Sequence, residues 1–89
     1  LCNTDKRIRE QAIEHNIEVI EYGKDLGSSA ITIWLADGTS FPGQANFQKA
    51  LENTGNSLGE IYQKLPNDWK MLIEYKPFEP NFYSMVVPD

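Results

Sequence analysis

The chain has 89 residues, of which 40% are hydrophobic, and a formal net charge of −5. This length allows one small domain, and an acidic balance without a basic cluster argues against binding to nucleic acid or to an acidic membrane. The single cysteine, Cys2, excludes an internal disulfide and suits a reducing compartment, and no stretch approaches the roughly 20 apolar residues of a membrane span.

Both ends of the chain are unusual. Residues 1–4 (Leu-Cys-Asn-Thr) have the character of the end of a strand, and the last residues, Val87-Pro88-Asp89, stop without a terminating turn. We therefore expect residues 1–89 to be a partial domain that is truncated at both ends. A short protein with a processed N-terminus is the alternative.

The first predicted helix begins near Lys6, where Thr4 or Asp5 can act as the N-cap. Its apolar residues recur at roughly helical spacing. Gly27 predicts the end of the helix, because glycine adopts the left-handed conformation at low cost. Gly23, inside the last turn, is expected to weaken the helix by about 1 kcal/mol relative to alanine.

The next predicted elements are a strand over 30–35, a helix over roughly 45–65 and a strand over 70–75. The first strand is apolar on both faces and rich in β-branched residues, which is typical of a covered parallel strand. The second helix carries an amphipathic stripe. It consists of Phe47, Leu51, Thr54, Leu58, Ile61 and Leu65.

Strands that alternate with helices predict a parallel α/β sheet with crossover connections. The order strand, helix, strand, helix, strand and the 40-residue spacing between Leu35 and Tyr75 fit a βαβαβ fragment of a (β/α)8 TIM barrel. A doubly wound sheet also fits locally, but no Gly-x-Gly-x-x-Gly turn follows a strand here.

Candidate functional residues gather where the two strands end. Because alternate strand residues share a face, Trp34 should lie on the inward face of the first strand, and Glu74 and Lys76 on that of the second. Active sites of TIM barrels lie at this carboxyl edge. Pro77 ends the second strand, since proline cannot donate a ladder hydrogen bond.

These residue types suit chemistry on a polar substrate. Glu74 is an oxygen ligand for Mg²⁺ or Mn²⁺, Lys76 can stabilise a developing alkoxide, and Trp34 can wall a sugar pocket with its flat face. The alternative is an ion pair at a wet strand end beside a packed tryptophan. Asp37 has the chemistry of a metal or substrate ligand, but Asp-Gly after a strand more often forms a turn.

Two phrases of the sequence resemble bacterial L-rhamnose isomerases. The first runs from Trp34 to Gln44 (WLADGTSFPGQ) and the second from Glu74 to Ser84 (EYKPFEPNFYS). The second phrase is also similar to the Glu-Pro-Lys-Pro-Asn-Glu-Pro motif of xylose isomerases. Tyr75 and Phe78 replace its first proline and its asparagine, which favours the rhamnose branch.

The resemblance implies a metal-dependent aldose–ketose isomerase that interconverts L-rhamnose and L-rhamnulose on a TIM barrel, usually with Mn²⁺. Glu74 would then be a metal ligand, Lys76 a catalytic residue that contacts the carbonyl-end oxygen, and Trp34 a substrate-binding residue. The remaining metal ligands of the family lie on later strands, beyond Asp89. The full enzyme would be cytoplasmic and homotetrameric, and the 89-residue chain by itself inactive.

Two other functions fit parts of the pattern. A fragment of another metal-dependent barrel, such as an endonuclease-type enzyme, would need a basic groove, whereas this chain is acidic. A stand-alone, non-catalytic α/β module would have no further sequence on either side.

Overall fold

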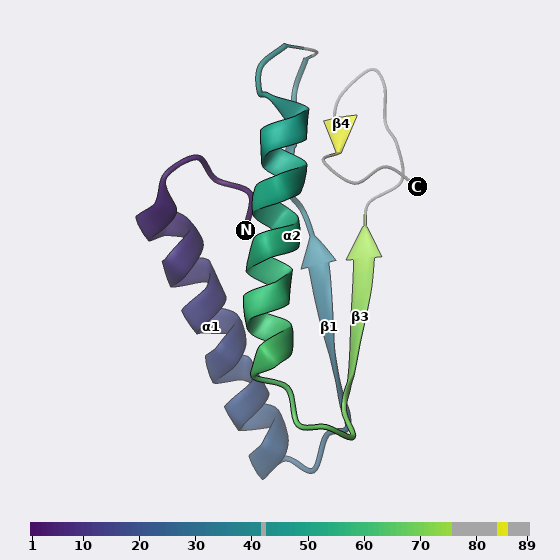
Figure 1. Cartoon of the computed structure of the whole chain (residues 1–89). Coiled ribbons are helices and arrows are strands. Elements are labelled where there is room, and N and C mark those ends of the chain that lie inside the picture. Colours follow the sequence, from purple (N-terminus) through teal and green to yellow (C-terminus); the bar gives the residue numbers. More distant parts are fainter. Residues whose placement is uncertain (42, 76–83, 86–89) are drawn as a thin grey trace.

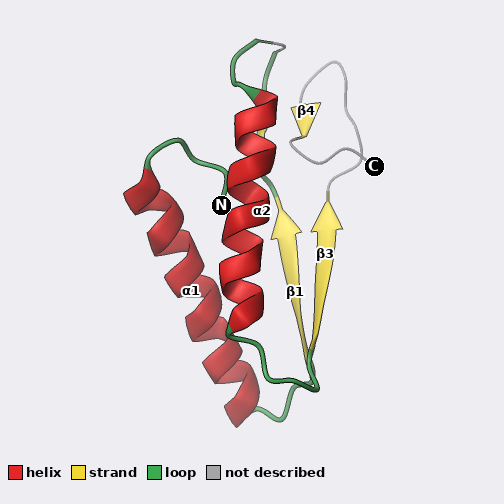
Figure 2. Cartoon of the chain, in the orientation of Figure 1, coloured by secondary structure: helices red, strands yellow, loops and turns green. Residues whose placement is uncertain are grey.

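The computed structural model describes residues 1–41, 43–75 and 84–85. The element order is α1 (Lys6–Asp25), β1 (Ala30–Leu35), β2 (Gly38–Thr39), α2 (Phe47–Gln63), β3 (Lys70–Tyr75) and β4 (Ser84–Met85). β1 and β3 lie side by side, and the two helices form a layer against one face of these strands (Figures 1 and 2). The mixed α/β architecture with a parallel sheet is as the sequence predicts.

The ends of α1 follow from local chemistry. Asp5 caps its start, because the carboxylate accepts the backbone N–H of Arg7 at 2.9 Å. At the other end Gly27 has φ +76°, and the N–H groups of Ser28 and Gly27 donate to the carbonyls of Gly23 and Lys24. These two bonds form a Schellman motif, which confirms the predicted stop at Gly27.

The helix α2 begins two residues later than predicted, after its N-cap Asn46. Its buried face is more polar than the predicted stripe. The buried residues are Ala50, Asn53, Thr54, Ser57 and Ile61. Phe47 and Leu51 are instead exposed, by 37% and 53%, so the amphipathic stripe only partly describes the packed face.

The two long strands occupy the predicted ranges. They are parallel, and Trp34 is the register partner of Glu74, as Thr32 is of Leu72. Along β1 buried and exposed residues alternate, with Ile31, Ile33 and Leu35 turned toward the helices. The predicted parallel pairing and the predicted facing of β1 are therefore confirmed.

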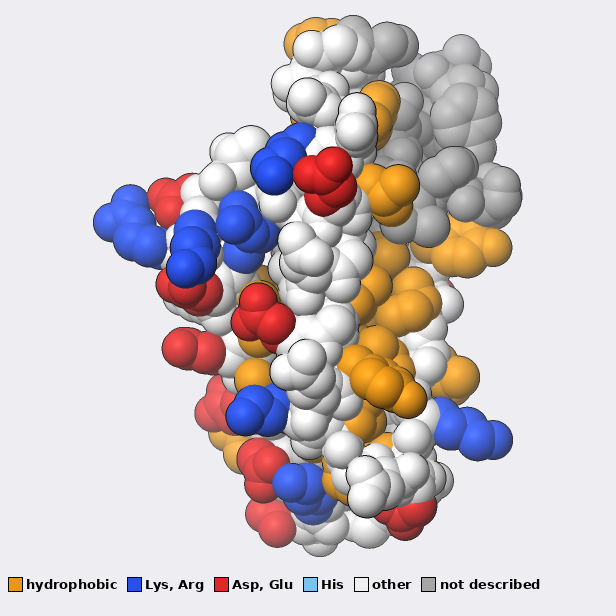
Figure 3. All heavy atoms as spheres, in the orientation of Figure 1, with side chains coloured by type: hydrophobic (Ala, Val, Ile, Leu, Met, Phe, Trp, Pro, Cys, Tyr) orange, Lys and Arg blue, Asp and Glu red, His pale blue; other side chains and the backbone are white. Residues whose placement is uncertain are grey.

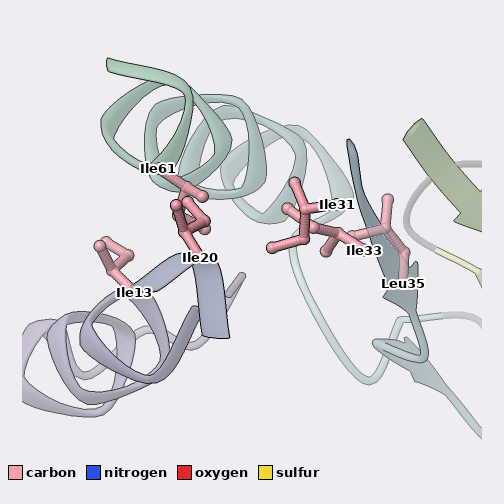
Figure 4. Close-up of a cluster of buried hydrophobic side chains, with 6 residues drawn as sticks. All are labelled: Ile13, Ile20, Ile31, Ile33, Leu35 and Ile61. Carbon is pink, nitrogen blue, oxygen red and sulfur yellow. The ribbon is translucent and has the colours of Figure 1, made fainter. Parts of the chain in front are cut away.

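The core lies between this face of β1 and the two helices (Figure 4). It is an aliphatic cluster of Ile13, Ile20, Ile31, Ile33, Leu35 and Ile61. Trp69 packs against it from the turn before β3. A Cβ atom on Gly23 would lie 2.6 Å from the Trp69 ring, so the absence of a side chain at Gly23 makes room for Trp69. The space that Trp69 needs therefore explains why glycine stands at position 23 despite its lower helix propensity.

The surface of the two helices differs (Figure 3). Charged side chains cover the α1 side, whereas hydrophobic side chains gather along the border of α2 with the sheet. Large exposed hydrophobic residues on α2 and β3 include Leu51, Tyr62, Leu72, Ile73 and Tyr75. Neither helix in the described part of the chain is long and apolar enough to cross a membrane.

The expectation that residues 1–4 end a strand was wrong, and the structure adds a short strand that the sequence analysis does not contain. Residues 1–4 form no strand, because their backbone groups bind side chains instead of a neighbouring strand: the Leu1 carbonyl accepts from Ser57, and the Cys2 N–H donates to Asp37. The loop after β1 contains the short strand β2, which pairs antiparallel with β4. A two-residue strand is too short to leave a periodic pattern in the sequence.

Candidate functional site

The carboxyl edge of the β1–β3 sheet brings together two of the three predicted site residues. Trp34 and Glu74 are Cα partners across the two parallel strands. Partners in a parallel ladder point to the same face, so both side chains lie on the face opposite the helices. Trp34 is 61% exposed and Glu74 is also exposed, which leaves both accessible to a ligand.

Lys76 lies outside the described residues, as does Glu79. The predicted role of Lys76 therefore stays a prediction. Glu74 supplies one carboxylate to the edge. In the part of the chain that the structure describes, no group of three or more His, Cys, Asp or Glu side chains is arranged to hold a metal ion.

The two phrases that carry the family resemblance meet in space. Gly38 and Thr39 of the first phrase pair with Met85 and with Ser84, the last residue of the second. β4 lies beyond the carboxyl ends of β1 and β3 (Figure 1). Sequence reasoning missed this pairing and predicted only that Trp34, Glu74 and Lys76 share one edge of the sheet.

Asp37, three residues after Trp34, makes structural contacts. Its Oδ2 atom accepts the Cys2 backbone N–H at 3.1 Å and an N–H of the Leu1 amino group at 3.2 Å. Burial raises the pKa of the Asp37 carboxyl, but the positive amino group and these hydrogen bonds outweigh burial, so the pKa lies below its usual value. Asp37 is thus an ionised acceptor that ties residues 1–2 to the end of β1.

The other side of this attachment comes from α2. The Ser57 hydroxyl donates to the Leu1 carbonyl at 2.8 Å, and the Asn53 amide donates to the Cys2 and Asn3 carbonyls at 3.3 and 3.5 Å. The sequence signal for this arrangement was the polar residues at 53 and 57, one helical turn apart and in step with Ile61.

The surroundings of Cys2 do not favour a reactive thiolate. Burial and the neighbouring Asp37 carboxylate raise the pKa of its thiol, which keeps it neutral. His15, on α1, lies 3.8 Å from the Glu18 carboxylate on an exposed face of the helix.

No protein-family model matches the chain. Two curated proteins are similar to it over all 89 residues: a probable sugar isomerase from Rhizobium meliloti, with 53% identity, and a probable sugar isomerase from Mesorhizobium japonicum, with 51% identity. In each case the chain spans only about a fifth (21%) of the relative's length. The chain is therefore similar to one part of proteins named as probable sugar isomerases.

Proposed function

We propose that this chain is part of a metal-dependent aldose–ketose isomerase that interconverts L-rhamnose and L-rhamnulose. The observation that carries the proposal is the in-register pairing of Trp34 with Glu74, both exposed at the carboxyl edge of a parallel sheet. Similarity to two probable sugar isomerases supports the general class of reaction. The choice of rhamnose rests on the resemblance of the two sequence phrases.

The proposed site gives each residue a separate task. The flat face of Trp34 would pack against the apolar face of a sugar ring or chain. Lys76 would stabilise negative charge on the carbonyl-end oxygen while hydrogen moves between the first two carbons. Glu74 would hold a divalent metal through its carboxylate oxygens.

The metal fits the site only in part. A hard divalent ion such as Mn²⁺ takes several oxygen or nitrogen ligands, and the described residues contribute Glu74 without two further ligands beside it. When bound, the metal would supply polarisation of the two sugar oxygens. Its other ligands would come from parts of a longer protein, which suits a chain that spans about a fifth of its relatives.

The (β/α)8 barrel belongs to the same proposal. Both helices lie on one face of the sheet and Trp34 and Glu74 on the other, as in a barrel wall whose inner face carries the site. The tetrameric assembly and the cytoplasmic location of the full enzyme are parts of the proposal that rest on the resemblance alone.

The test is made in a full-length protein that contains this chain. Glu74→Gln keeps the shape but removes the anionic ligand. It should lower ketose formation by more than about 100-fold and weaken metal binding, because even an outer-shell partner of a metal ligand is worth roughly 10–100-fold. Glu60→Gln, at an exposed position of α2, is the matched control. Wild-type turnover in Glu74→Gln would refute the site.

Lys76→Met separates the stabilisation of the substrate oxygen from the binding of the metal. It should lower turnover more than metal affinity, with Lys70→Met at the exposed start of β3 as its control. A metal titration and a ketose assay measure both quantities.

The 89-residue chain by itself should form no ketose. Its one proposed metal ligand is the Glu74 carboxylate, whereas tight binding of a metal ion needs several donor atoms held together. Incubation with Mn²⁺ and L-rhamnose tests this, and ketose above the metal-only background would contradict it.

A further inference from the structure

Side chains from the loop after β1 and from both helices hold the three residues at the start of the chain. Arg9 of α1 donates to the Asn3 carbonyl at 2.6 Å. Asp37, in the loop after β1, accepts the N–H groups of residues 1 and 2. Asn53 and Ser57 of α2 donate to the carbonyls of residues 1–3. We call this arrangement the backbone clamp: Asp37, Asn53 and Ser57 around residues 1–3.

The clamp residues on α2 are deeply buried. Asn53 is 5% exposed and Ser57 is 2% exposed, so each would cost free energy if its side chain had no partner. A buried donor that is left unsatisfied loses its hydration without gaining a bond in return. The backbone carbonyls of residues 1–3 supply the partners that these two buried side chains need.

The clamp adjoins the strand end that carries Trp34. Leu35 is 4% exposed and fixes the strand from the core side, while Asp37 fixes the backbone two residues later. Trp34 itself is 61% exposed and has little packing of its own. The direction of the Trp34 side chain therefore depends on the backbone between these two anchors.

We propose that Asp37 is a positioning residue: through the backbone clamp it fixes the end of β1 and so orients Trp34 toward the substrate. It acts as a hydrogen-bond acceptor and not as a metal ligand. The kinetic part of this inference rests on the proposed function. A misplacement of about 1 Å in a positioning contact can cost up to roughly 100-fold in rate, so a group outside the reacting centre can matter.

The first experiment is a kinetic comparison in a full-length protein that contains the chain. Asp37→Ala removes the bond that the Cys2 N–H donates and should lower kcat/KM for L-rhamnose by about 3–10-fold, the equivalent of one hydrogen bond. Asp37→Asn can place its amide oxygen where Oδ2 lies, so it should restore most of the loss. Asp25→Ala, which removes an exposed acid at the end of α1, is the control.

A second pair of variants tests whether the clamp works as a unit. Asn53→Ala should reproduce the kinetic defect of Asp37→Ala, whereas Asn56→Ala, on an exposed position of the same helix, should not. An unchanged kcat/KM in Asp37→Ala with a lowered Tm would overturn the proposal and leave only a fold anchor. Failure of Asp37→Asn to restore activity, together with weaker metal binding, would also overturn it.

A third measurement does not depend on isomerase activity. The 89-residue chain has two tryptophans, Trp34 and Trp69, whose indole N–H signals can be followed by NMR. Asp37→Ala should shift the Trp34 signal and leave that of Trp69 in place, and Asp37→Asn should shift neither. If both signals stay unchanged in Asp37→Ala, the clamp does not position Trp34. If wild-type full-length protein forms no ketose while the Trp34 signal behaves as expected, the proposed function fails and the clamp stands.

Discussion

The two long strands are equal in length and lie side by side, yet they differ sharply in burial. In β1 every second residue is buried, whereas in β3 Met71 alone is partly buried and the other residues are exposed. Ile33 and Ile73 are register partners, but their exposures are 4% and 38%. The core cluster draws residues from α1, α2 and β1, so β1 is the strand that the helices cover.

This difference shows that a strand can be fully paired by backbone hydrogen bonds while its side chains stay exposed to solvent. The parallel ladder fixes β3 beside β1, but hydrophobic stabilisation depends on the area removed from water. β3 and the neighbouring side of α2 keep large apolar side chains at the surface, including Leu51, Tyr62 and Ile73. That side is where a longer protein of the proposed barrel type would add its next helix.

The most direct test of this difference truncates an isoleucine at the same register position in each strand. Ile33→Ala should destabilise the chain by about 2–5 kcal/mol, because a fully buried aliphatic group is lost and a cavity remains. Ile73→Ala should cost less than about 1 kcal/mol, since the side chain is already partly in water. Urea unfolding followed by circular dichroism measures both. Equal losses would show that β3 is as well covered in solution as β1.

The anchor of β3 on α1 is tested at Gly23. In Gly23→Ala the new methyl group meets the Trp69 ring, and overpacking of about 1–3 kcal/mol should exceed the helix-propensity gain of about 1 kcal/mol. Gly55→Ala and Gly59→Ala on α2 meet nothing within 4 Å and should be stabilising by up to about 1 kcal/mol. Opposite signs in thermal unfolding would confirm that Trp69 occupies the space over Gly23. Stabilisation by all three substitutions would contradict it.

The smallest expected effect is the pH dependence of the stability that Asp37 contributes at the end of β1. The pKa of Asp37 is lower in the folded chain than its usual value near 4 in an unfolded chain, because the amino group and the Cys2 N–H favour the carboxylate. The unfolded state then binds more protons between the two pKa values. The contribution of Asp37 to stability is therefore complete above pH of about 4 and disappears as the pH falls through the folded-state pKa.

Urea midpoints measured from pH 6 down to pH 3 test this. The difference between wild type and Asp37→Asn should shrink with acidification, and Asp25→Asn, at the exposed end of α1, is measured in parallel as the control. A gap for Asp37→Asn that widens on acidification would show that the sign of the coupling is reversed.

Much of the local structure could be read from the sequence. The ranges of both long strands, the cap of α1 and the stop at Gly27 depend on side-chain chemistry and periodicity within a few residues. The facing of Ile33 and Trp34 likewise follows from the period of two along a strand. These features are set locally, so a sequence pattern is sufficient to predict them.

What only the tertiary structure decided involves residues far apart in the chain. Gly23 was predicted to destabilise α1, but its role is to leave space for the ring of Trp69, which lies 46 positions later in the sequence. Residues 1–4 were expected to form the end of a strand, but Asn53, Ser57 and Asp37 bind their backbone groups. Hydrogen bonds across 35–56 residues leave no local period, because their partners are chosen by packing and by the cost of burying an unpaired polar group.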